Sequence, residues 1–148
     1  MITLAEIENV EVAALANEAA EFLAGQSWCK GIGTGWLSFA IPGVLGIFLF
    51  DVVGKTVNVA PKVWVVVGDL PSAYIAQPAD AGWQDVLAGY VFEMRRWVTA
   101  VQSGLSVSAL IPVGVAPTHE HATMLARRLD FIQSDLLDQP VDSIEGTV

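Results

Sequence analysis

Three short apolar runs in the middle of the chain constrain the fold most, because the connections between them are short. The runs are VLGIFLFDVV (44–53), KVWVVVG (62–68) and SAYIAQ (72–77). Residues 54–61, which include a glycine and a proline, separate the first two runs, and only Asp69-Leu70-Pro71 separates the last two. A parallel crossover needs a dozen or more residues. The runs therefore predict an antiparallel meander whose middle strand is buried on both faces.

Apolar residues at helical spacing predict three helices around this meander. Their expected ranges are 4–24, 80–103 and 118–138. Thr3 and Glu6 form a capping-box pattern at the first helix, and Asp80 and Thr118 are the expected N-caps of the other two. The segment LSVSALIPVG (105–114) predicts a fourth strand, or an extended segment that ends at Pro112.

The order of these elements predicts the α+β class. We expect a small, mainly antiparallel sheet of three to four strands, a meander, packed with three helices. The length of 148 residues fits one domain. We expect a single globular domain over 1–139 and an acidic C-terminal tail over 140–148.

The stretch GQSWCKGIGTGW (25–36) holds the only cysteine and three glycines at alternate positions. A phosphate-binding glycine turn follows a strand and precedes a helix, whereas here the order is reversed. The stretch therefore predicts a flexible loop that leads into the sheet. Residues 31–50 carry no charge, but Pro42 and five glycines argue against a spanning helix. A peripheral membrane protein is kept as a second alternative.

The net charge of −9 resides in the two ends of the chain. The first 25 residues contain five glutamates and no cation, and residues 130–148 contain five further carboxylates and no cation. Such ends repel nucleic acid and anionic membrane surfaces. They permit a basic protein partner, although solubility alone would explain the same pattern. The candidate docking residues are Glu11, Glu18 and Glu21 of the first helix.

Cys29 and the two histidines are the candidate catalytic residues. A catalytic thiolate needs an adjacent base, and only His119 and His121 could supply it. The competing interpretation of Cys29 is a small, buried and inert thiol just beyond a helix C-terminus. On a helix, His119 and His121 diverge and cannot share one metal ion. We expect no metal and no cofactor.

Two further residues are candidates for contacts. Trp28, next to the lone cysteine, is predicted to be a packing anchor and is a candidate binding residue. Asp69 is a turn residue before Leu70-Pro71 and a candidate binding residue. A catalytic pair of Asp51 and Asp69 is disfavoured, since a meander places these strand ends apart.

Several stretches together resemble a family of small, functionally uncharacterised bacterial proteins. These are SWC, GIFLFDVV, VWVVVGDLPSAYI, YVFEMRRWVTAV, LIPV and PTHEHATMLARRLDFI, between about residues 25 and 137. The resemblance implies a bacterial, cytoplasmic protein and transfers no catalytic residue.

Composition favours a protein that acts through contacts. Apolar residues make up 53% of the chain and charged residues 16%, against roughly 25% charged residues in an ordinary domain. Such a surplus indicates a homo-oligomer or another obligate protein contact. We expect a non-catalytic, small acidic protein that acts through protein–protein contacts, in the manner of an immunity protein or an adaptor. The alternative is a small hydrolase or transferase that uses Cys29 with His121 or His119.

Overall fold

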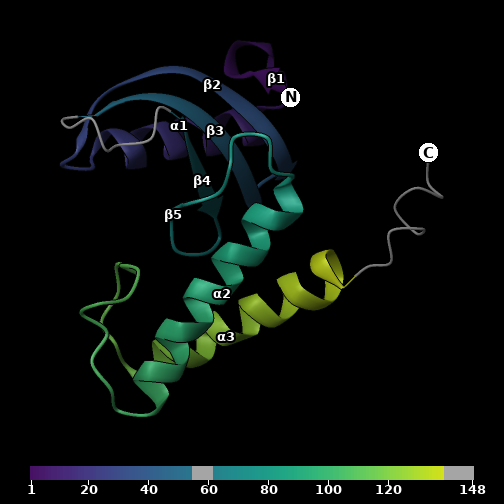
Figure 1. Cartoon of the computed structure of the whole chain (residues 1–148). Coiled ribbons are helices and arrows are strands. Elements are labelled where there is room, and N and C mark those ends of the chain that lie inside the picture. Colours follow the sequence, from purple (N-terminus) through teal and green to yellow (C-terminus); the bar gives the residue numbers. More distant parts are fainter. Residues whose placement is uncertain (55–61, 139–148) are drawn as a thin grey trace. The chain divides into compact units, whose positions relative to one another are not determined.

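The computed structural model describes residues 1–54 and 62–138 and divides the chain into two compact units, Met1–Gly89 and Tyr90–Val148 (Figure 1). The first unit holds the sheet and the first helix. The second unit holds the helices after residue 90. The helix α2 (Trp83–Gln102) begins in the first unit and ends in the second. The predicted acidic tail, 140–148, lies outside the described residues.

The sheet confirms the α+β class and the antiparallel meander. Its strands are β1 (Ile2–Thr3), β2 (Cys29–Ile41), β3 (Leu45–Gly54), β4 (Lys62–Gly68) and β5 (Ala73–Ile75). They lie in the order β1-β2-β3-β4-β5, and every neighbouring pair is antiparallel. The prediction of three to four strands is wrong, because the described sheet has five.

The additional long strand, β2, begins inside the stretch for which the sequence predicts a loop. Cys29–Ile41 pairs along β3, with Gly35 opposite Phe50 and Leu37 opposite Phe48. Glycine lowers strand propensity, so this stretch carries no local strand signal. Tertiary packing overrides that preference, because Gly35 leaves room for the side chains of Phe50 and Leu4. Three register shifts interrupt the pairing of β2 with β3.

The segment 105–114 contains no strand, so the prediction of a fourth strand there is wrong. The Oγ of Ser106 accepts a hydrogen bond from the backbone N–H of Ser108 at 3.2 Å, and the N–H of Leu110 donates to the Val107 carbonyl at 3.0 Å. Local bonds of this kind compete with a strand ladder for the backbone.

The first helix begins later than predicted. A 3-10 turn, η1 (Leu4–Glu6), comes first, and α1 occupies Val10–Ala24. The Asn9 side chain caps α1 by accepting from the N–H groups of Glu11 and Val12 at 2.9 and 3.0 Å. The Glu6 carboxylate does accept from the Thr3 N–H at 2.8 Å, as expected of the capping pattern, but that pattern belongs to the 3-10 turn.

The other helices lie close to their predicted ranges. The helix α2 starts at Trp83, so Asp80 is not its N-cap. Thr118 does cap α3 (His119–Ile132), since its Oγ1 accepts from the His121 N–H at 3.2 Å. A π-helical turn, η2 (Gln133–Leu137), continues α3 nearly to the predicted end.

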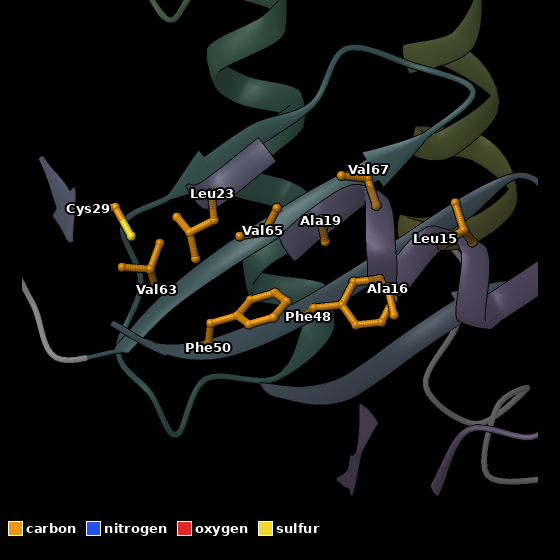
Figure 2. Packing of buried hydrophobic residues seen from close by; sticks show 10 residues of the cluster. All are labelled: Leu15, Ala16, Ala19, Leu23, Cys29, Phe48, Phe50, Val63, Val65 and Val67. Carbon is orange, nitrogen blue, oxygen red and sulfur yellow. The ribbon is translucent and has the colours of Figure 1, made fainter. Parts of the chain in front are cut away.

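The core of the first unit lies between α1 and one face of the sheet (Figure 2). Alternate residues of β3 and β4 point toward α1 because side chains alternate along a strand. The cluster consists of Leu15, Ala16, Ala19, Leu23, Cys29, Phe48, Phe50, Val63, Val65 and Val67. The intervening residues Trp64 and Val66 are also buried, which confirms that β4 is covered on both faces.

Candidate interaction site

The predicted acidic residues lie together on the outer face of α1. Glu11, Glu18 and Glu21 are all exposed, while Leu15, Ala19 and Leu23 face the core. At 100° per residue the three glutamates fall within about 80° of the helix circumference, and they extend over roughly 15 Å of its length. Among the described residues none of the three forms an ion pair.

An aromatic cluster borders the C-terminal end of this acidic face. The Trp28 ring meets the Tyr74 ring edge-on at 5.2 Å between centroids, and the Phe22 ring lies 6.4 Å from that of Tyr74. Tyr74 is 41% exposed, and Phe22 and Trp28 are half-buried. Phe22 follows Glu18 by four residues on α1, so the two side chains are neighbours on the helix surface.

Local backbone geometry places the three rings. The helix α1 ends at Ala24, and Gly25 begins a tight turn in which the Gln26 N–H donates to the Leu23 carbonyl at 3.1 Å. The Gln26 side chain also donates to the Phe22 carbonyl at 3.0 Å, which holds the turn against the helix. Trp28 leaves this turn beside β5, the edge strand that carries Tyr74.

We call the combined feature the acid–aromatic surface. It consists of Glu11, Glu18, Glu21, Phe22, Trp28 and Tyr74. Its members come from α1, from the turn before β2 and from β5, all within the first unit. The sequence predicts the three glutamates and Trp28, but it gives no signal that Phe22 and Tyr74 lie beside Trp28.

Asp69 lies near the opposite end of the acidic face. Its N–H donates to the Val44 carbonyl at 2.8 Å, which ties the end of β4 to the turn between β2 and β3. Gly43 in the same turn has φ +72°, and a Cβ added there would collide with Oε2 of Glu11. Glu11 and the exposed Asp69 therefore both adjoin this turn.

Cys29 is placed in the core rather than on the surface. The residue is 9% exposed, and its thiol donates a long hydrogen bond, 3.5 Å, to the Gly31 carbonyl. Figure 2 shows the sulfur within the apolar cluster between α1 and the sheet, near Leu23 and Val63. This is the environment of a small packing residue. The two histidines belong to the second unit, so pairing of either with Cys29 stays a prediction.

The histidines make the contacts of a helix start. A ring nitrogen of His121, Nδ1, lies 2.9 Å from the Ala116 carbonyl, and its backbone N–H donates to Thr118. His119, two residues earlier at the start of α3, is exposed. In the part of the chain that the structure describes, no group of three His, Cys, Asp or Glu residues could hold a metal ion.

The sequence does not predict the contact between Asp51, Lys62 and the Trp36 ring. Asp51 and Lys62 face each other across β3 and β4 and form an ion pair, and Lys62 Nζ lies 4.4 Å from the centre of the Trp36 ring. Both charged side chains are more than a third exposed, so the pair contributes little to stability. The register also places Asp51 and Asp69 at opposite ends of the strands, as expected, which argues against a shared catalytic role.

Comparison with protein-family models, curated proteins and solved structures found no significant match to this chain. No helix within residues 1–54 and 62–138 has both the length and the apolar character needed to cross a bilayer.

Proposed function

We propose that the chain is a non-catalytic interaction protein whose acid–aromatic surface docks a basic protein partner. One observation carries the proposal: three exposed carboxylates without an ion pair among the described residues border a partly exposed aromatic cluster. Carboxylates alone would be equally useful for solubility. The adjacent rings add a contact that a solvated acidic helix does not need.

The combination suits arginine and lysine side chains. A carboxylate attracts the cationic head, and the faces of Trp28 and Tyr74 attract a cation within about 6 Å of the ring centre. A single exposed ion pair is worth only about 0–1 kcal/mol. Several pairs around partly buried aromatic residues form the kind of centre that dominates protein interfaces. The acidic field would also raise the rate of encounter with a basic protein.

The broader setting is part of the same proposal. The motif resemblance supports a bacterial, cytoplasmic protein of the uncharacterised family named above. The charge of −9 supports a role like that of an immunity protein or an adaptor, both of which act by binding.

A labelled arginine-rich peptide tests the docking surface. We expect fluorescence anisotropy to show that the full chain binds a rhodamine-labelled tetra-arginine peptide, and that binding weakens as salt rises. The double variant Glu18→Lys/Glu21→Lys should reduce the affinity at least tenfold. The matched control Asp80→Lys/Asp85→Lys changes the net charge equally at two other exposed carboxylates and should retain most of the affinity.

The aromatic part needs its own variant, because charge reversal tests only the carboxylates. Tyr74→Ala removes an exposed ring from the short strand β5 and should weaken peptide binding without changing the net charge. Equal losses in the Glu18/Glu21 and Asp80/Asp85 variants would show that only overall charge matters, and would refute a defined docking surface.

A further inference from the structure

The helix α3 carries a second face that its own unit does not bury. Its core-facing residues are Ala122, Leu125, Leu129 and Ile132. About 120° around the helix lies another stripe at i, i+3, i+4 and i+7 spacing. This stripe consists of Met124, Arg127, Arg128 and Phe131, and we call it the α3 outer face.

The α3 outer face is both apolar and basic. Met124 is 44% exposed and Phe131 is 46% exposed, and the two arginines lie between them along the helix. An exposed methionine and phenylalanine on one helical stripe indicate a contact surface rather than a solvated face. Arg127 is exposed and forms no ion pair among the described residues.

The two arginines of α2 already form ion pairs. Arg95 donates to Asp130 at 3.1 Å, and Arg96 donates to Glu93 at 3.3 Å. Arg127 is therefore an arginine of the described chain that remains available to an external carboxylate, and it lies between two exposed apolar side chains. This arrangement is the complement of the acid–aromatic surface, where carboxylates lie beside partly exposed rings.

We propose that the α3 outer face of one copy docks on the acid–aromatic surface of a second copy. The proposal rests on the docking surface proposed above and names its partner: another molecule of this chain. The α3 outer face extends over about 10 Å of helix from Met124 to Phe131, which fits within the roughly 15 Å from Glu11 to Glu21. Arg127 meets Glu18 and Glu21, while Phe131 and Met124 cover Phe22 and Tyr74.

The contact is heterologous, because two different surfaces of the chain meet. After one such contact, each of the two copies still has one surface that is not bound. The assembly closes into a ring or a symmetric pair only if these remaining surfaces also bind each other or a further copy. It covers apolar residues from both units, which fits a chain that is 53% apolar and only 16% charged.

The test is sedimentation velocity on the full chain at low and high salt. We expect species heavier than the 15.8 kDa monomer at low salt, and dissociation as salt rises. Arg127→Glu and Glu18→Lys/Glu21→Lys should each weaken self-association at least tenfold. Arg96→Glu makes the same charge change at another exposed arginine and should leave self-association intact.

Complementation identifies the two faces as partners between molecules. An equimolar mixture of the Arg127→Glu variant and the Glu18→Lys/Glu21→Lys variant retains one intact pair of surfaces and should form mixed complexes. A chain that carries all three changes exchanges the charges of the contact between Arg127 and the pair Glu18 and Glu21, and should associate with itself again. Circular dichroism and thermal unfolding of each variant establish that its fold is retained.

A monomer at every salt concentration would overturn the inference, as would a mixture that forms no mixed complexes. The arginine-peptide assay separates this failure from failure of the docking surface. A chain that stays monomeric but binds the peptide through Glu18 and Glu21 refutes only self-docking. A chain that does neither refutes both proposals.

Discussion

Two glycines of β2 provide a matched test of the packing that supports the docking surface. Neither Gly31 nor Gly35 has a positive φ, so alanine causes no backbone strain at either position. A Cβ at Gly35 would lie 2.7 and 2.8 Å from two ring carbons of Phe50 and 2.9 Å from Cδ1 of Leu4. A Cβ at Gly31 would meet no atom within 4 Å.

The expected magnitudes follow from this difference. Overpacking a tight core costs about 1–3 kcal/mol. Replacing glycine with alanine in a permissive conformation stabilises by about 0.4–1 kcal/mol, because the unfolded chain loses entropy. We therefore expect Gly35→Ala to lower the free energy of unfolding by about 1–2 kcal/mol, and Gly31→Ala to leave it unchanged or raise it by up to about 1 kcal/mol.

Urea unfolding followed by tryptophan fluorescence measures both values. The double variant Gly35→Ala/Leu4→Ala supplies a further check, because removing the Leu4 side chain relieves one of the collisions. Its loss of stability should be smaller than the sum of the two single losses. Equal stabilities for Gly31→Ala and Gly35→Ala would refute the placement of β2, since that is the result expected if residues 25–36 form a loop.

Three other substitutions test the packing, the capping and the titration of the chain. Phe48→Ala should lower the free energy of unfolding by about 3–5 kcal/mol in urea titrations, since the ring is fully buried beneath α1; a loss below about 1 kcal/mol would contradict that packing. Thr118→Ala should cost about 0.5–2 kcal/mol by removing the cap of α3, and Thr118→Ser should retain most of it. Burial raises the pKa of the Tyr90 hydroxyl above its ordinary value of 10.0, so this group stabilises the fold below pH 10 and its contribution falls as the pH rises further. In a Tyr74→Phe chain, where Tyr90 is the only tyrosine, absorbance at 295 nm should therefore rise only as the near-ultraviolet circular dichroism is lost; ionisation before unfolding would contradict this.

The parts of the fold that the sequence predicts are those fixed by strong local patterns. The short connections around KVWVVVG specify antiparallel pairing of β3, β4 and β5, and the structure has that pairing. The Thr118 cap and the apolar stripe of α3 also agree with the prediction. In each case neighbouring residues in the sequence carry the information.

The parts that the sequence does not predict depend on contacts between distant residues. The glycines of β2 weaken the local strand signal, and the strand forms because β3 pairs along it and Phe50 fills the space beside Gly35. The start of α1 shifts to Val10 because Asn9, rather than Thr3, caps it. Helical spacing predicts that the glutamates share a face. The cluster of Phe22, Trp28 and Tyr74 depends on the arrangement of three elements.

The most direct test of the docking surface is a ¹⁵N-NMR titration of the full chain with the tetra-arginine peptide. The indole N–H signal of Trp28, assigned by Trp28→Phe, should shift together with the backbone amides of Glu18 and Glu21. The indole N–H of buried Trp64, which donates to the Pro78 carbonyl at 2.9 Å, should not move. Peptide binding that leaves Trp28 and the two glutamates unshifted would contradict the proposal that this surface docks a basic partner.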